Sequence, residues 1–280
     1  MSRVAIATCA GENVDPDAPV LLAALHDSGL DATLCVWDDP GVSWGDYDLT
    51  VIRSTWDYTS RHLEFLEWAK AVPRLYNPYE VVRYSLDKHY LGDLATRGHR
   101  VVTSFFADVG LEAQFPAGDF VVKPSVGAGS MDAARYSSYQ SEDALHHVQR
   151  LHDIGRDALI QPYIASVDER GERALVFIDG QFSHAMTKGA MLNVTQLDRN
   201  ALFRWEQMSR AEAEPDALEL ANDVLDGLGF ELLYARVDLV WTPEGWALME
   251  LELVEPSLFL SFNERAPLRL AQAISARIAG

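Results

Sequence analysis

Short apolar runs alternate with amphipathic stretches along the first fifty residues of the chain. Apolar residues are continuous or nearly so over residues 4–7, 32–37 and 49–52, and such short runs are typical of buried strands. Residues 20–26 have apolar positions at helical spacing and are followed by Gly29, a common helix end. The order strand, helix, strand, strand predicts a small α/β lobe with a partly parallel sheet.

The middle of the chain predicts further elements that are separated by polar turns. A hairpin is expected over residues 120–136, and an acidic loop over residues 165–171. Ser141 is the expected cap of the helix that follows the hairpin. The remaining helices and strands of this part are expected over residues 61–71, 81–97, 101–106, 141–153 and 158–160.

The last third of the chain predicts two more hairpins. The first turns at Asp179-Gly180, a strong turn dipeptide. The segment 187–203 shows no clear periodicity, and an active-site lid or a plain surface loop explains it equally well. The expected strands and helices are residues 172–178, 181–186, 215–228, 234–241, 246–253 and 264–278. Three domains are expected, comprising residues 1–112, 113–188 and 189–280.

Composition narrows the class of protein. A chain of 280 residues with 48% hydrophobic residues is long and apolar enough for two or more globular lobes. A net charge of −19 argues against nucleic acid and anionic membrane surfaces as partners, so a phosphate ligand would need local cations or metal. The two cysteines, Cys9 and Cys35, do not suggest a disulfide framework. Without a signal peptide or long apolar run, we expect a cytoplasmic protein with no membrane partner.

A small-residue loop inside the hairpin at 120–136 is the first candidate for chemistry. The sequence Phe-Val-Val-Lys-Pro-Ser-Val-Gly-Ala-Gly-Ser places Lys123 before the loop and Gly127 and Gly129 within it. Exposed backbone N–H groups in such a loop suit phosphate oxygens, and the lysine adds a positive charge. The lysine precedes the glycines, so this is not a Walker-type P-loop. An ordinary hairpin turn is the alternative at this point.

The hairpin formed by residues 234–241 and 246–253 carries the second candidate site. Strand alternation puts Arg236 and Asp238 on one face, and Glu250 and Glu252 on one face of the partner strand. If three carboxylates and an arginine converge in a sheet, the carboxylates repel one another and all four groups lose hydration, which costs free energy. A hard cation such as Mg²⁺ removes that cost. The alternative is a solvent-exposed face, which the neighbouring Leu, Val, Trp and Met positions disfavour.

A third candidate segment follows the strand at residues 49–52. Open α/β sheets bind ligands beyond the carboxyl ends of their strands. Arg53, Ser54, Thr55 and Asp57 are therefore candidates to hold a zwitterionic small molecule. A salt-bridged strand end with a packed Trp56 is the alternative interpretation.

These stretches together resemble the ATP-grasp superfamily, and the resemblance covers nearly the whole chain. The most specific parts are the loop after Lys123, the run Gln-Pro-Tyr-Ile at residues 161–164, and Arg236-x-Asp238 followed by Glu250-x-Glu252. The resemblance implies an α/β (α+β) fold with an N-terminal α/β lobe, a central lid lobe and a C-terminal lobe. It also implies that ATP is bound between two antiparallel sheets of the last two lobes.

The resemblance assigns roles residue by residue. Nucleotide contacts are expected from Lys88, Lys123, Ser125, Gly127, Ala128, Gly129, Ser130, Gln161, Pro162, Tyr163, Ile164 and either Asp168 or Glu172, the last two being alternatives for the ribose. The expected Mg²⁺ ligands are Asp238, Glu250 and Glu252. Lys188 would be a third cation of the lid, and Arg236 would steady the transferred phosphoryl group. An N–H group near Ser257 would join Arg236 at the oxyanion. The family's usual Glu-x-Asn is Glu250-x-Glu252 here, which adds a negative charge without removing a ligand oxygen.

The implied activity is ATP- and Mg²⁺-dependent formation of a carbon–nitrogen bond through an acyl phosphate. The N-terminal signatures Thr-Cys-Ala and Arg-Ser-Thr-Trp-Asp-Tyr resemble a bacterial, glutathione-synthetase-like branch whose implied reaction is closure of O-ureido-D-serine to D-cycloserine. The expected partner is a small amino acid. An intermolecular amino-acid ligase and a non-catalytic ATP-binding module are the alternatives, and the oligomeric state, including a homo-oligomer, is left open.

Overall fold

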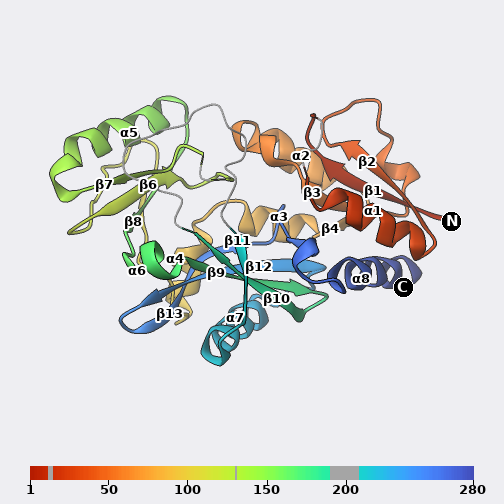
Figure 1. The fold of residues 1–280 in the computed structure, drawn as a ribbon. Coiled ribbons are helices and arrows are strands. Elements are labelled where there is room, and N and C mark those ends of the chain that lie inside the picture. The colour runs from red at the N-terminus through yellow and green to blue at the C-terminus, as the bar shows by residue number, and fades with distance from the viewer. Residues whose placement is uncertain (12–14, 130, 190–207) are drawn as a thin grey trace.

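The computed structural model describes residues 1–11, 15–129, 131–189 and 208–280, and its strands form three sheets (Figure 1). One sheet is parallel and the other two are antiparallel, so the mixed α/β class is confirmed. In the described ranges, no helix is both long and apolar enough to cross a lipid bilayer. The division at residues 112/113 and 188/189 remains a prediction.

The first sheet has four strands in the order β2-β1-β3-β4, and all of its pairings are parallel. All six residues of β3 are buried, as expected of an inner parallel strand that is covered on both faces. The elements are β1 (Ser2–Thr8), α1 (Ala18–Asp27), β2 (Leu30–Val36), β3 (Leu49–Ser54), α2 (His62–Ala71) and β4 (Leu75–Tyr76). The sequence therefore predicted these elements correctly, except for the two-residue β4.

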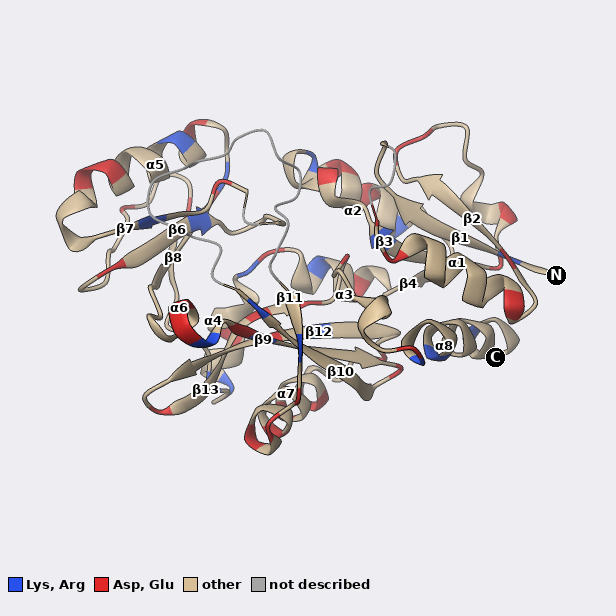
Figure 2. Ribbon diagram, in the orientation of Figure 1, with Lys and Arg blue, Asp and Glu red and all other residues tan. Residues whose placement is uncertain are grey.

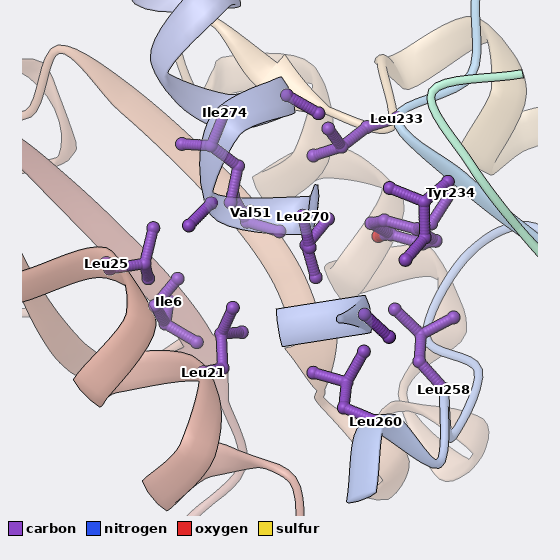
Figure 3. Packing of buried hydrophobic residues seen from close by; sticks show 14 of the residues in the cluster. Ile6, Leu21, Leu25, Val51, Leu233, Tyr234, Leu258, Leu260, Leu270 and Ile274 are labelled. Atoms are coloured by element: carbon purple, nitrogen blue, oxygen red, sulfur yellow. The ribbon is translucent and has the colours of Figure 1, made fainter. Parts of the chain in front are cut away.

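The C-terminal helix α8 (Ala266–Ala279) packs against α1, so the two ends of the chain share one core (Figures 1 and 3). Leu270 and Ile274, four residues apart on α8, meet Leu21 and Leu25 from α1 in this core. The spacing is that of an amphipathic helix, which confirms the prediction for this segment. The shared core attaches the C-terminal part of the chain directly to the N-terminal sheet.

The helix predicted over residues 81–97 is two helices, α3 (Tyr79–Ser85) and α4 (Tyr90–Thr96). Asp87 Oδ1 accepts a hydrogen bond from His89 N at 3.1 Å, a local bond that competes with helix continuation. The backbone N–H of Lys88 donates instead to Ser125 O, at 3.0 Å. Lys88 therefore lies in a break between two helices, and its backbone is hydrogen-bonded to Ser125, the residue that follows the strand at residues 120–124.

The second sheet has the strand order β5-β8-β6-β7 and is antiparallel throughout. Its elements are β5 (Phe105–Ala107), β6 (Phe120–Pro124), β7 (Ala134–Tyr136), α5 (Ser141–Asp153) and β8 (Ala158–Pro162). The predicted strand start at Val101 was wrong, because that residue forms only an isolated bridge to Leu248. Ser141 does not cap α5, because the preceding 3-10 turn already places it inside the helix. A capping box made by Ser137 and Gln140 begins that 3-10 turn (Ser138–Gln140).

The third sheet has five antiparallel strands in the order β11-β10-β9-β12-β13. Its elements are β9 (Glu172–Ile178), β10 (Gln181–Lys188), β11 (Met208–Ala211), α7 (Pro215–Leu228), β12 (Tyr234–Thr242) and β13 (Gly245–Glu252). The predicted acidic loop before β9 contains a short helix, α6 (Ser166–Arg170). β11 was not predicted. Most of the segment 187–203 lies outside the described residues.

Candidate active site

The second and third sheets face each other across a cleft. One pocket is lined by β6 and β8 from one sheet and by β10 and β13 from the other. Two adjoining cavities share Lys88, Glu250 and Glu252 with each other and extend to the glycine loop and to the loop after β13. Figure 2 shows that charged positions occur on strands of both sheets, including β6. The cleft therefore brings together the segments that the sequence singled out separately.

The pairing of β12 with β13 aligns the charged residues as predicted. Arg236 lies opposite Glu252, and Asp238 lies opposite Glu250. Residues directly opposite each other in an antiparallel pair share one face of the sheet. The register then shifts, and Met249 becomes the extra residue of a bulge that lines the pocket between the sheets.

Two lysines approach Glu250. Lys88 Nζ is 2.9 Å from Oε1 of Glu250, and Lys123 Nζ is 3.8 Å from Oε2. Burial alone would raise the pKa of Glu250, but the two lysines outweigh it and hold this pKa well below its usual range. Burial lowers the pKa of Lys123, and the nearby Lys88 adds to that effect. Both lysine Nζ atoms therefore lie beside Glu250, near the end of β6.

Asp238 is held by Arg236 and Lys188. Arg236 donates to both of its carboxylate oxygens at 2.9 Å, and Lys188 Nζ is 2.8 Å from Oδ2. Burial opposes the charged form, but these two cations lower the pKa of Asp238. Lys188 also lies 3.2 Å from Glu172, and Arg236 also donates to Glu252. The predicted metal ligands are therefore paired with cations in this arrangement.

The chemistry of these carboxylates fits a divalent cation. Among the residues that the structure describes, no three acidic, His or Cys side chains converge closely enough to hold a metal. The ionised form of Glu252 is nevertheless disfavoured. Burial raises its pKa to about 8, and repulsion from Asp238 and Glu250 acts in the same direction. A hard dication with oxygen ligands would relieve that repulsion. The predicted ligand set stays a prediction.

The glycine loop leaves β6 and lies against the same cavities. Ser125 is buried, and Gly127, Ala128 and Gly129 line two of the cavities. The Nζ atom of Lys88 donates to Gly127 O at 2.8 Å, so the lysine also ties this loop. Gly129 has a φ of 60°, in the left-handed region that favours glycine. Ser130 lies outside the described residues.

The run at residues 161–164 lines the pocket between the sheets, together with apolar Val121 and Met249. Gln161 donates from Nε2 to Ser104 Oγ at 3.0 Å, and Tyr163 N donates to Asp119 O at 2.8 Å. An apolar slot beside a strand end suits a flat heterocycle.

The two predicted ribose contacts differ in position. Glu172 lines the pocket, whereas Asp168 is not among the residues described as lining it. Asp168 accepts a hydrogen bond from the Tyr163 hydroxyl and lies 3.7 Å from Arg135. The geometry therefore favours Glu172 over Asp168.

The predicted substrate residues lie at the end of β3 and just after it, and they are not among the residues described as lining the cavity. Arg53 is fully buried, donates to Pro256 O at 2.9 Å, and lies 3.6 Å from Asp15. Asp57 accepts from Trp37 Nε1 at 2.8 Å and pairs with Arg61 at 3.1 Å. The Oγ atoms of Ser54 and Thr8 are 2.7 Å apart, and Thr55 is buried. Substrate contact by Arg53, Ser54, Thr55 and Asp57 remains a prediction.

The cavity is also lined by residues that were not predicted from the sequence to belong to the site. Trp56 and Tyr58 come from the segment after β3, Tyr90 from α4, and Glu255 from the loop after β13. Trp56 and Tyr58 flank the selected Asp57, so the segment was recognised but not the residues of it that line the cavity. Ser257 lines the same cavity, and its carbonyl oxygen accepts from Arg236 Nη1 at 3.1 Å.

Comparisons with known proteins place this geometry in a family. Residues 4–77 match the family model described as D-cycloserine synthetase DcsG, N-terminal domain. The chain is 40% identical over 286 aligned residues to the cycloserine biosynthesis protein DcsG of Streptomyces lavendulae, with 95% of each chain covered. It also matches the crystal structure of D-cycloserine synthetase DcsG, with a TM-score of 0.86, 37% identity and coverage of 99% of this chain and 100% of that one.

A more distant structure shows the same fold. The ATP-grasp ligase PsnB, solved with its minimal precursor, Mg and ADP, matches with a TM-score of 0.60 at 14% identity, covering 99% of this chain and 97% of that one. At this identity the match shows the fold alone. Together with the 40% identical relative, these matches confirm the resemblance inferred from the sequence. The chain belongs to the DcsG family of ATP-grasp enzymes, which are carbon–nitrogen ligases.

Proposed function

We propose that the protein uses ATP and Mg²⁺ to activate the carboxylate of O-ureido-D-serine and to close it to D-cycloserine. The observation that carries the proposal is the convergence of Lys88, Lys123, Lys188 and Arg236 on the carboxylates of β12 and β13. The 40% identity to the cycloserine biosynthesis protein DcsG supports the choice of substrate.

The cleft offers separate places for the parts of ATP. The apolar slot at residues 161–164 suits the adenine ring, and Glu172 at its edge suits the ribose hydroxyls. Lys88, Lys123 and the N–H groups of residues 127–129 suit the phosphates. Asp238, Glu250 and Glu252 would hold Mg²⁺, which neutralises charge on the phosphates when bound.

The substrate carboxylate is a poor electrophile, and the proposed chemistry activates it where the cationic side chains of the cleft gather. A carboxylate oxygen of the substrate takes the γ-phosphoryl group, giving an acyl phosphate and ADP. The internal N–H nitrogen of the ureido group then attacks the acyl carbon, the C–O bond to phosphate breaks, and the N–H proton leaves. Release of free D-cycloserine also requires water to remove the carbamoyl group, which yields carbon dioxide and ammonia.

The protein's own residues position and stabilise these steps. In this proposal Lys188 and Arg236 would stabilise the moving phosphoryl group, and Arg236 with a backbone N–H group near Ser257 would stabilise the developing oxyanion. No side-chain nucleophile is needed, since activation comes from ATP. Catalysis in this scheme is mainly orientation and electrostatic stabilisation.

The test is ADP release with O-ureido-D-serine as the sole organic substrate besides ATP, with mass spectrometry of the product. The proposal predicts Mg²⁺-dependent ADP together with a cyclised product and no need for an added amine. Turnover only with pairs of amino acids would instead establish an intermolecular ligase.

A further inference from the structure

We propose that Glu255 and the Tyr58 hydroxyl form the subsite that binds the α-ammonium group of the amino-acid substrate. The inference rests on the proposed activation of an amino-acid carboxylate in the same cavity. It names the group that distinguishes an amino acid from a simple carboxylic acid.

Three carboxylates belong to the described lining of the cavity, and two of them are already paired. Glu250 is 2.9 Å from Lys88 Nζ, and Glu252 accepts from Arg236. Glu255 lines this cavity together with Tyr58, and burial and the nearby charge of Glu255 both raise the pKa of the Tyr58 hydroxyl. Within the described ranges, no Lys, Arg or His side chain forms an ion pair with Glu255 within 4.0 Å. It is therefore the carboxylate in this cavity that can accept a new cation without displacing a salt bridge.

The position of Glu255 suits the shape of an α-amino acid. The ammonium nitrogen and carboxyl carbon of such a molecule are both bonded to one carbon, and so lie about 2.5 Å apart. An ammonium subsite must therefore adjoin the place where the carboxylate is activated. Glu255 lies in the loop that follows Glu252, and Arg236 contacts Ser257 two residues further on.

The end of β3 and the 3-10 turn that follows it hold this loop in place. Trp56 Nε1 donates to Glu255 O at 3.0 Å, and Arg53 Nη1 donates to Pro256 O at 2.9 Å. Tyr58 is almost fully buried, and its ring stacks on Phe65 with centroids 4.7 Å apart. The subsite is thus supported on both sides, which reduces the entropy lost when a ligand binds. Arg53 acts here as a positioning residue for Glu255.

The electrostatic environment favours a bound cation. Burial, and repulsion from Glu250, raise the pKa of Glu255 to about 7, although Tyr58, Lys88 and Arg236 act in the opposite direction. A positive group beside the carboxylate favours its charged form. The bound ammonium and Glu255 therefore stabilise each other.

The experiment is calorimetric binding in the presence of Mg²⁺ and a non-hydrolysable ATP analogue, so that no turnover is needed. The ligands are O-ureido-D-serine and its des-amino analogue, 3-(ureidooxy)propanoate. For wild-type protein we expect tighter binding of the amino acid. In Glu255→Gln we expect the amino acid to lose about 10- to 100-fold in affinity and the des-amino analogue to change less than about twofold.

Two further variants serve as controls for the effect of Glu255→Gln. Tyr58→Phe keeps the packing and should weaken amino-acid binding by a smaller factor, and Glu264→Gln, at an exposed position, should change neither ligand. An equal loss for both ligands in Glu255→Gln, or no loss, would overturn the ammonium subsite while leaving the ligase intact. Wild-type protein that binds neither ligand would count against the proposed substrate as well.

Discussion

Lys88 reaches Glu250 across two elements of the fold, with 2.9 Å between Nζ and Oε1. The lysine lies between α3 and α4, whereas the glutamate lies on β13. A residue expected to bind phosphate thus contacts a residue expected to bind metal. Although burial opposes its charge, Glu250 raises the pKa of Lys88, so the lysine stays protonated. Nucleotide and metal would each take over one partner of this pair.

Replacing Lys88 by Met should strongly reduce catalysis. The variant removes a cation from the phosphates and leaves Glu250 with a weaker partner. We expect kcat/KM for ADP release to fall by about 100- to 1000-fold, as when one transition-state donor is removed. Lys88→Arg should retain more activity, because it keeps the charge. A Lys88→Met enzyme within about twofold of wild type would show that this contact has no catalytic role.

Glu172 and Asp168 provide a matched test of the ribose contact. Glu172→Ala should raise the KM for ATP by about tenfold, the cost of losing one charge-assisted hydrogen bond. Asp168→Ala should leave that KM within about twofold, because Asp168 is directed to Tyr163 and Arg135. Steady-state kinetics at saturating amino acid measure both values. The reverse order of effects would assign the ribose to Asp168.

Arg53 should matter first for stability. Arg53→Met removes the partner of two buried carboxylates, Asp15 and Asp17, at 3.6 and 3.8 Å. Loss of one side of a buried ion pair typically costs about 3–5 kcal/mol. We expect a Tm lower by roughly 10 °C. Arg61→Met, which breaks more exposed pairs, should cost about 1 kcal/mol or less.

The pH dependence of the Arg53→Met defect has a definite sign. Burial raises the pKa of Asp17, and Arg53 lowers it in the wild-type protein. Without the arginine that pKa rises further, so the variant gains more than wild type from protonation as the pH falls. Thermal unfolding should show a smaller difference in Tm near pH 5 than at pH 8. A difference that grows toward low pH would contradict this explanation.

His89 should stabilise the fold more at low pH. Its ring nitrogens lie 2.6 Å from Asp87 and 3.1 Å from Asp108, and these carboxylates outweigh burial and raise its pKa. The stabilisation is complete below the unfolded pKa of about 6.5 and is lost as the pH rises through the folded pKa.

The corresponding measurement compares His89→Asn with His146→Asn, a change at an exposed position on α5. His89→Asn should lower the Tm by about 2 °C at pH 5.5 and by less at pH 8.5, a small effect because the pair is partly exposed. His146→Asn should show no such trend. Equal losses at both pH values would indicate that packing on Phe106, and not charge, explains the effect of His89.

The sequence predicted that Arg236 and Asp238 share a face of β12 and that Glu250 and Glu252 share a face of β13, because strand alternation has a fixed period. It did not predict the bulge at Met249, which shifts the register and sets Asp238 opposite Glu250. It did not predict the helix break at Lys88, since the break depends on a tertiary bond to Ser125. Four-residue β11 was missed because it carries little periodicity of its own.

The roles of Arg53, near the end of β3, and of Asp57, which follows that strand, were harder to predict for a similar reason. Arg53 and Asp57 carry charge, and charge alone suggested substrate binding. Their partners, Pro256 and Trp37, come from other parts of the chain. Burial of a charged residue depends on such distant partners, which no local pattern contains. Tyr58 and Glu255 reach the cavity for the same reason, through packing and not through sequence spacing.

The most direct test of the account follows an oxygen atom. O-ureido-D-serine labelled with ¹⁸O in both carboxylate oxygens is turned over with unlabelled ATP and Mg²⁺, and the released phosphate is analysed by mass spectrometry. Activation as an acyl phosphate predicts one ¹⁸O atom in each phosphate released with the cyclised product. Unlabelled phosphate accompanying cyclised product would contradict the mechanism, because the carboxylate would then never have carried the phosphoryl group.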